Sequence, residues 1–200
     1  MVGKKHIFFD LFGVLLGSDQ SAVIHHVSKT INMSYLQTKD ILMGEIFMKL
    51  ERGEIGFEQY FQNIQYALPN GNRLDYNSFK TMWTRSKISE LPAVEVLGTL
   101  SNKYSLNIIS NTSEAHINEL KTQFKFFSCF EHIITSEAAK SLKPSIEIFN
   151  YALNIADAVS LSSIFIDDML SNINAANSLG IRSHHYTNYE EFNTFILSLI

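Results

Sequence analysis

Three acidic side chains stand directly after apolar runs of the sequence. Asp10 follows Ile7–Phe9, and the adjacent pair Asp167 and Asp168 follows Ile164–Ile166. If these runs are strands of a parallel α/β sheet, their carboxyl ends meet at the edge where such sheets bind ligands. Three carboxylates would repel one another there unless a cation lay between them, and Mg²⁺ prefers hard oxygen ligands. The sequence therefore predicts a magnesium site that includes Asp10, Asp167 and Asp168.

Two other segments could contribute groups that bind an anion. In IISNTS, Ser110 and Asn111 precede a predicted helix start, where hydroxyls and free backbone N–H groups can hold a phosphate. The simpler alternative is that these residues only cap the helix. In SLKPSIEIF, Lys143 precedes a helix with Pro144 in its first turn, and from there a lysine can reach inward to an anion. Lys143 could instead be a solvated surface charge, and Lys140 is a nearby competitor that lacks the following proline.

The apolar runs predict the strands that would position these side chains. The run His6–Leu16 is apolar almost throughout, which is typical of a strand that is buried on both faces. The other predicted strands are Ser105–Ser110, His132–Ser136, Ser163–Asp168 and Ile181–Tyr186. Helical stretches lie between most of them, and this alternation predicts an α/β fold in which a Rossmann-like parallel sheet is flanked by helices.

Between residues 17 and 88 the pattern changes. No strand-like run occurs, and apolar residues recur at helical spacing in Ala22–Ile31, Tyr35–Leu50, Phe57–Leu68 and Tyr76–Ile88. We therefore expect residues 1–16 and 89–200 to form the Rossmann-like core and residues 17–88 to form a small, inserted, all-helical cap. Phe57, Phe61 and Trp83 are expected to pack in the interior of that insertion.

The charge balance and the composition favour a globular protein that acts on small molecules. With 16 basic and 20 acidic side chains, the chain has no excess of positive charge, so we expect neither nucleic acid nor a membrane as a partner. Asp10 interrupts the apolar run near the N-terminus, which favours a buried strand over a signal peptide. A single cysteine, Cys129, cannot form an internal disulfide and favours a cytoplasmic location. A monomer and a homodimer are both compatible with the sequence.

Taken in order, four segments of the chain resemble the four motifs of the haloacid dehalogenase superfamily. They are FFDLFGVL, IISNTS, SLKPSIEIF and FIDDMLSNINAANSLG, and the last is especially similar to the phosphatase-like branch. The helical insertion, including GEIGFEQYF, resembles the C1-type cap, which closes over the substrate in this group.

The resemblance implies covalent catalysis by a carboxylate. Asp10 would be the nucleophile and form an aspartyl intermediate. Ser110 and the backbone of Asn111 would bind the transferring group, Lys143 would stabilise charge on it, and Asn172 would orient the fourth motif. The Mg²⁺ ligands that the resemblance implies are Asp10, Asp167, Asp168 and the backbone carbonyl of Phe12.

Phe12 departs from the motif. Phosphatases of this superfamily usually carry a second Asp there, two positions after the nucleophile, and that Asp protonates the leaving alcohol. A phenylalanine cannot transfer a proton. We therefore expect a phosphatase that acts on a small phosphorylated metabolite with a good leaving group, such as a sugar phosphate.

Two alternatives remain open. The 2-haloacid dehalogenases often carry an aromatic residue where this chain has Phe12, and a halide leaves without a proton. Against this hypothesis, those enzymes work without a metal and hold the substrate carboxylate with an arginine early in the cap. This chain has the Asp167–Asp168 pair and no arginine before Arg52. The third hypothesis is a weakly active or non-catalytic protein whose phosphate pocket binds a ligand or a protein partner.

Overall fold

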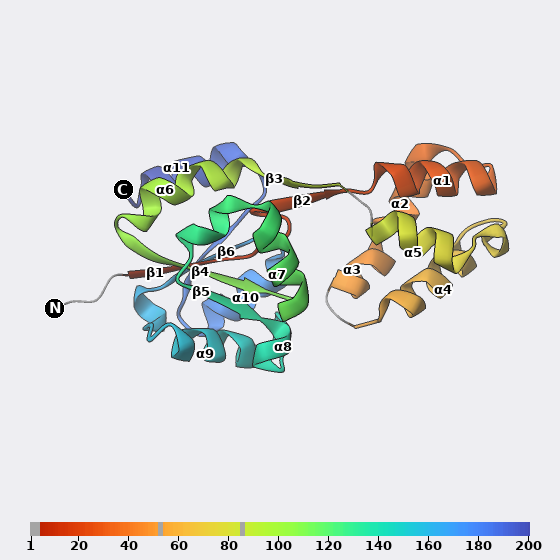
Figure 1. Ribbon diagram of the computed structural model, residues 1–200. Helices are drawn as coiled ribbons and strands as arrows, with labels where there is room; N and C mark the ends of the chain where they lie inside the picture. Colours follow the sequence, from red (N-terminus) through yellow and green to blue (C-terminus); the bar gives the residue numbers. More distant parts are fainter. Residues whose placement is uncertain (1–4, 52–53, 85–86) are drawn as a thin grey trace. The chain divides into compact units, whose positions relative to one another are not determined.

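The computed structural model describes residues 5–51, 54–84 and 87–200 (Figure 1). The chain divides into two compact units, Met1–Gly17 with Ser89–Ile200, and Ser18–Ile88. We call the first the core unit and the second the helical unit.

The core unit is built on a five-stranded parallel sheet with the strand order β5-β4-β1-β6-β7. The strands are β1 (Lys5–Phe9), β4 (Tyr104–Ser110), β5 (His132–Thr135), β6 (Ile164–Asp167) and β7 (Arg182–His185). The central strands are buried almost throughout because helices cover both faces of the sheet. The predicted α/β fold with a Rossmann-like parallel sheet is confirmed.

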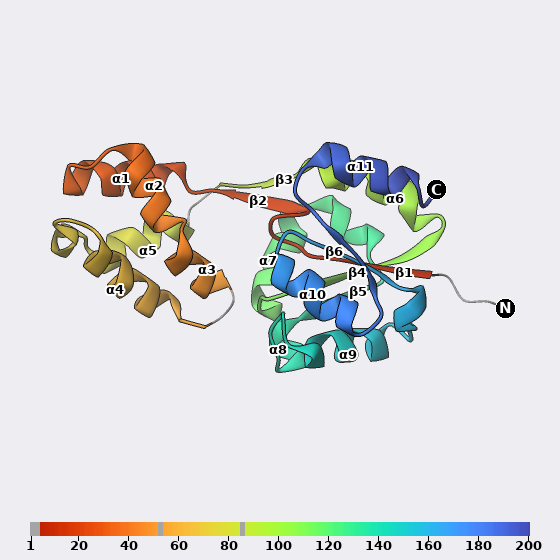
Figure 2. The ribbon, with the colours of Figure 1, turned by 180° about the vertical axis from the view of Figure 1, so that it is seen from behind.

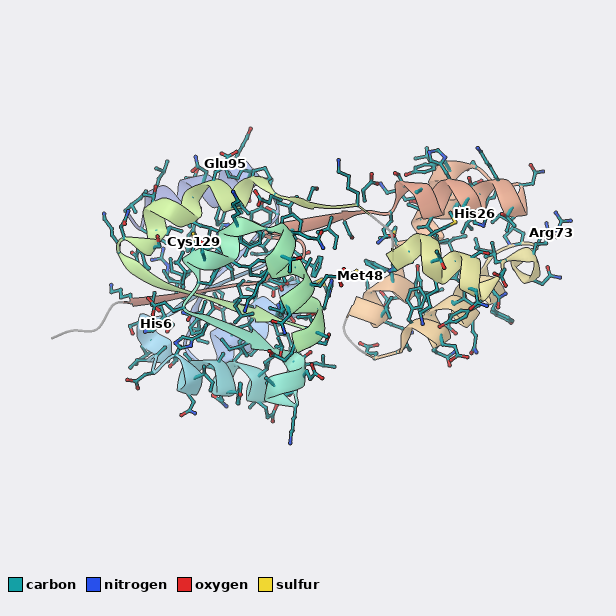
Figure 3. The ribbon with its side chains drawn as sticks, in the orientation of Figure 1. His6, His26, Met48, Arg73, Glu95 and Cys129 are labelled. Atoms are coloured by element: carbon teal, nitrogen blue, oxygen red, sulfur yellow. The ribbon has the colours of Figure 1, made fainter. Side chains whose placement is uncertain are left out.

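Two groups of helices cover this sheet. The helices of the core unit are α6 (Leu97–Ser101), α7 (Glu114–Gln123), α8 (Ser136–Ala139), α9 (Ile146–Ile155), α10 (Leu170–Ser178) and α11 (Tyr189–Leu197), with the 3-10 turns η2 (Pro92–Val96), η3 (Lys125–Cys129) and η4 (Ser160–Ser162). In both views α6 and α11 run along one face, and α8, α9 and α10 along the other (Figures 1 and 2). Phe149 of α9 packs on Phe8 and Phe165 of the sheet in one apolar cluster. Cys129, at the end of η3, is half-buried (Figure 3).

The first strand is shorter than the apolar run that predicted it. β1 ends at Phe9, and residues 10–15 form a turn instead of continuing the strand, in which Phe12 and Gly13 are half-buried and the other residues are buried. The N–H groups of Leu15 and Leu16 both donate to the carbonyl of Leu11, which closes this turn. All three leucines are fully buried, so an apolar pattern alone does not distinguish the turn from a strand.

The helical unit has an apolar core of its own. It contains α1 (Ser21–Ile31), α2 (Tyr35–Leu42), α3 (Glu45–Glu51), α4 (Phe57–Ala67), the 3-10 turn η1 (Gly71–Arg73) and α5 (Tyr76–Thr84). Phe61 is buried in this core, and Phe57 and Trp83 pack against it, as predicted. The buried hydroxyl of Tyr60 donates to the carbonyl of Leu42 at 2.7 Å, which ties α4 to α2. None of the described helices is long and apolar enough to cross a membrane.

The predicted helix Tyr35–Leu50 is two helices. α2 ends at Leu42 and α3 begins at Glu45, with Gly44 between them. A Cβ at Gly44 would lie 2.4 Å from the backbone oxygen of Asp40, so the close approach at this break requires a glycine. Apolar spacing continues across the break, and the pattern therefore predicts one helix.

The insertion is also not entirely helical. β2 (Leu16–Asp19) and β3 (Lys87–Glu90) pair with each other in a two-stranded sheet, and the boundary between the two units falls inside both strands. In the predicted helix Tyr76–Ile88, α5 ends at Thr84, and residues 85 and 86 lie outside the described part of the chain. Because β2 and β3 are far apart in the sequence, no local periodicity indicates their pairing.

Candidate active site

The structure brings Asp10, Asp167 and Asp168 together at the carboxyl edge of the core sheet. β1 and β6 are neighbours, with Phe9 paired to Ile166, and the N–H of Asp10 donates to the carbonyl of Ile166 at 2.8 Å. One side-chain oxygen from each acid lies within 4.8 Å of the other two. Such a group of hard oxygen ligands has the spacing and the chemistry to hold a divalent cation.

Lys143 is the counter-charge to two of these acids. Its side chain is only 2% exposed, and its Nζ lies 2.8 Å from Oδ1 of Asp10 and 2.7 Å from Oδ2 of Asp167. Lys143 is therefore not a solvated surface charge, whereas Lys140 is exposed. Oδ1 of Asp10 also accepts from the N–H of Leu11 at 2.6 Å. Among the described residues, Oδ2 of Asp10 has no hydrogen-bond partner, so it is the oxygen available to a metal or a substrate.

The side chain of Asn111 fixes the backbone of Lys143. Its Oδ1 accepts from the Lys143 N–H at 2.8 Å, and its Nδ2 donates to the Lys143 carbonyl at 3.0 Å. Pro144 precedes α9 instead of lying in its first turn, because the N-cap residue Ser145 keeps an extended backbone (φ −60°, ψ 136°). The loop that carries Lys143 is thus held by the segment that follows β4.

Ser110 ends β4 and is 2% exposed. The N-cap of α7 is Ser113, whose hydroxyl accepts from the N–H of His116 at 3.3 Å. Capping therefore does not occupy the hydroxyl of Ser110, which has no hydrogen-bond partner within the part of the chain that the structure describes. That hydroxyl is free to bind an anion at the same sheet edge as the acids.

Asp167 is fully buried, and both of its oxygens are bound. Oδ1 accepts from the N–H of Met169 at 2.8 Å, and Nδ2 of Asn172 donates to Oδ1 and Oδ2 at 2.9 and 3.0 Å. Asn172 lies in the first turn of α10, so this helix fixes the carboxylate. Nε2 of His185 lies 2.9 Å from the backbone carbonyl of Asp168, at hydrogen-bond distance.

The site holds more negative charge than one lysine neutralises. Burial raises the pKa of Asp10 well above its ordinary value, and the charges of Asp167 and Asp168 add to this effect although Lys143 opposes it. Burial, with the charge of Asp167, also raises the pKa of Asp168 to about 6. Burial alone would lower the pKa of Lys143, but the Asp10 and Asp167 carboxylates outweigh it and raise that pKa. A bound cation would relieve this excess of charge.

Gly13 lets the turn after Asp10 pass directly against Asp168. Its φ is 91°, and a Cβ at this position would lie 2.4 Å from Oδ2 of Asp168. Only glycine combines this backbone conformation with that close approach. The carbonyl of Phe12 belongs to the same turn, and its role as a metal ligand stays a prediction.

All four sequence motifs lie within one match to a known protein family. Residues 7–185 match the family model described as haloacid dehalogenase-like hydrolase. The chain belongs to this family. Among the relatives of this haloacid dehalogenase-like hydrolase is the sesquiterpene phosphatase astK of Aspergillus oryzae, which is 24% identical over 186 residues, covering 92% of this chain and 90% of that protein. The family and the hydrolase class that the motifs implied are confirmed.

Solved structures of the family share the fold. A haloacid dehalogenase family enzyme of Bacteroides thetaiotaomicron, crystallised with magnesium and inorganic phosphate, is 25% identical with a TM-score of 0.61. The match covers 95% of this chain and 99% of that one. A crystallised dehalogenase gives a TM-score of 0.67 at 17% identity over 94% of this chain and 88% of that one, which is a likeness of fold alone.

The four motifs of this haloacid dehalogenase-like hydrolase do not include His116, which the structure places against Phe12. The rings of Phe12 and His116 stack with their centroids 5.6 Å apart and 20° between their planes. No motif marks His116. Its position in the sequence could still have indicated it, because His116 lies in the first turn of the helix after IISNTS. A helix that follows a parallel strand begins at the edge of the sheet where ligands bind.

Proposed function

We propose that this hydrolase is a Mg²⁺-dependent phosphatase that acts on a small phosphorylated metabolite. The observation that supports this most is the Asp10 carboxylate, which lies between a buried lysine and two further acids. In the first step, Oδ2 of Asp10 attacks the phosphorus, and the ester bond breaks with its electron pair going to the leaving oxygen. In the second step, water attacks the phosphorus of the aspartyl phosphate, and the bond from phosphorus to Asp10 breaks with its electron pair returning to the carboxylate. The protons of the water leave with the inorganic phosphate.

Groups of the core unit would hold the phosphate and the metal. The hydroxyl of Ser110 and the N–H of Asn111 would bind phosphoryl oxygens, and Lys143 would neutralise charge on them. Mg²⁺, when bound, supplies positive charge that reduces the repulsion between the phosphate and the attacking carboxylate. The magnesium and phosphate bound to the Bacteroides enzyme support this choice of ligands. The proposed Mg²⁺ ligands are Asp10, Asp167, Asp168 and the carbonyl of Phe12.

We further propose that the helical unit is a C1-type cap that selects the substrate. Phe12 offers no proton to a leaving alcohol, which favours an ester with a good leaving group, such as an anomeric sugar phosphate. The Aspergillus relative is a sesquiterpene phosphatase, so prenyl phosphates are a second class to test.

A panel assay of product release tests the proposed function. The protein is incubated with sugar phosphates, prenyl phosphates, aryl phosphates and 2-haloacids, each with Mg²⁺ and with EDTA. We expect phosphate release that requires Mg²⁺. Release of halide without a metal would establish dehalogenation, which Phe12 favours. Binding of Mg²⁺ and phosphate without either product would contradict both reactions and indicate a binding protein.

The affinity for Mg²⁺ should fall as the pH drops below about 6. Asp168 binds a cation in its ionised form, and its raised pKa of about 6 means that a proton competes with the metal below that pH. We expect the apparent Kd for Mg²⁺ to rise by up to about tenfold per pH unit in that range, measured by titration calorimetry. Asp168→Asn should bind Mg²⁺ weakly and with less dependence on pH. A wild-type Kd that is the same above and below pH 6 would contradict this expectation.

Gly13→Ala should weaken Mg²⁺ binding by about 10- to 100-fold. The added Cβ would displace the carboxylate of Asp168, and alanine also disfavours the positive φ at this position. Gly98→Ala is the matched control, because a Cβ there meets nothing within 4 Å, and it should bind Mg²⁺ as the wild type does. Equal affinities for the two variants would show that the contact between Gly13 and Asp168 does not shape the metal site.

A further inference from the structure

His116 lies where the segments that follow β1 and β4 meet. Phe12, two residues after Asp10, stacks on its imidazole with ring centroids 5.6 Å apart. Thr112, two residues after Ser110, places its Oγ1 3.1 Å from Nδ1 of the same imidazole. One imidazole therefore contacts both segments that leave the carboxyl ends of β1 and β4.

The strand order puts this imidazole and the acids Asp167 and Asp168 on opposite sides of β1. β1 lies between β4 and β6. Asp167 and Asp168 come from the end of β6, whereas Thr112 and α7 follow β4. A phosphate held at Asp10 would therefore have a cation on one side and His116 on the other.

Nε2 is the free polar atom of His116. Thr112 contacts Nδ1 and is itself well fixed, since its N–H donates to the carbonyl of Ser110 at 3.0 Å and its carbonyl accepts from Oγ of Ser136 at 3.1 Å. The His116 side chain is half-buried, and no residue in the described ranges forms a hydrogen bond with its Nε2. The hydrogen bond made by one ring nitrogen determines what the other nitrogen can offer to a ligand.

We propose that His116 is a further catalytic residue, in which Nδ1 accepts from the Thr112 hydroxyl and Nε2–H donates a hydrogen bond to the leaving oxygen of the substrate. This inference rests on the proposed phosphatase function. As the P–O bond breaks, its electron pair stays on that oxygen, and the hydrogen bond stabilises the developing negative charge. The oxygen then takes a proton from water, and His116 keeps its own. The donor that Phe12 lacks is thus supplied by the ring that stacks on it.

A purely structural role for His116 predicts a different result. If stacking on Phe12 only holds the turn after Asp10, loss of the imidazole would slow every substrate by the same factor. A hydrogen bond to the leaving oxygen matters most when that oxygen becomes an alkoxide, and little when the charge is delocalised, as in 4-nitrophenolate. The dependence on the leaving group therefore separates the two roles.

The test compares His116→Asn and His116→Gln with the wild type at one neutral pH and saturating Mg²⁺, on an alkyl phosphate and on 4-nitrophenyl phosphate. Asn removes the donor at the Nε2 position, whereas the amide nitrogen of Gln reaches it. We expect His116→Asn to lower kcat/KM about 100-fold for the alkyl ester and less than about threefold for the aryl ester. His116→Gln should recover about tenfold of the loss on the alkyl ester. His132→Asn, at the opposite end of the sheet in the first residue of β5, is the matched control and should change neither rate.

Thr112→Val is a second variant, which keeps the imidazole and removes its anchor. It should cause a smaller loss that is again confined to the alkyl ester. Equal losses on both esters, or no loss on either, would overturn the role of His116 and leave the phosphatase function standing. A wild-type protein that releases phosphate from neither ester would overturn both, so the two failures are distinguishable.

Discussion

Asp10→Asn should abolish phosphate release, with kcat lowered by about 10⁴-fold or more. An amide does not form the aspartyl phosphate. The variant should fold, because Asn keeps an Oδ1 that accepts from Lys143 and from the N–H of Leu11. It also removes one of the charges that repel each other in the site, so we expect thermal unfolding at the same or a higher temperature than the wild type.

The matched control for Asp10→Asn is Asp40→Asn, a change at an exposed acid of the helical unit. It should retain the wild-type rate. The rates are measured as phosphate release with the best substrate of the panel. If folded Asp10→Asn retained more than about a hundredth of the activity, Asp10 would not be the nucleophile, and water would have to attack the phosphorus directly.

Lys143→Met should lose nearly all activity and about 3–5 kcal/mol of unfolding free energy in the metal-free protein. Methionine has a similar length, but it leaves the buried carboxylates of Asp10 and Asp167 without the ammonium that lies 2.8 and 2.7 Å from them. Urea unfolding measures the loss. Lys140→Met, at an exposed lysine of the same segment, is the control and should stay within about 0.5 kcal/mol of the wild type.

A double variant tests the cause of that destabilisation. Asp10→Asn combined with Lys143→Met removes one of the two uncompensated carboxylates, so it should unfold at a higher urea concentration than Lys143→Met alone. Mg²⁺ should also stabilise Lys143→Met, because the cation supplies the missing positive charge. If Lys143→Met unfolded at the wild-type urea concentration, these ion pairs would not stabilise the fold.

Most of the core sheet was predictable because its strands other than β7 contain short apolar runs that end in polar residues. The predicted strands Ser105–Ser110 and Ser163–Asp168 correspond closely to β4 and β6. The turn after Asp10 was not predictable in this way, since its leucines are as buried as those of a strand. The pairing of β2 with β3 depends on residues that are distant in the sequence, and periodicity reports only on near neighbours.

The candidate site also contains residues that the sequence could predict and contacts that it could not. Asp10, Asp167 and Asp168 could be found because each stands at a strand end, where side chains of that chemistry bind ligands. Lys143 could be found because it lies in the loop just before α9. The clamp of Asn111 on the Lys143 backbone could not be found, since it joins two loops whose approach only the packed fold determines. The stack of Phe12 on His116 is a contact of the same kind.

The chain passes between the two units once in β2 and once in β3, and the pairing of these strands places the two passages side by side. At the core-unit end of this pair, the N–H of Leu91 donates to the carbonyl of Leu15. A short linker in place of residues 18–88 would therefore join neighbouring chain ends at little entropic cost. The pairings of β1 with β4 and with β6, which position Asp10, involve only residues of the core unit. We therefore expect the core unit to accept inserted modules of other lengths between β2 and β3 without a change in the positions of Asp10, Asp167 and Asp168.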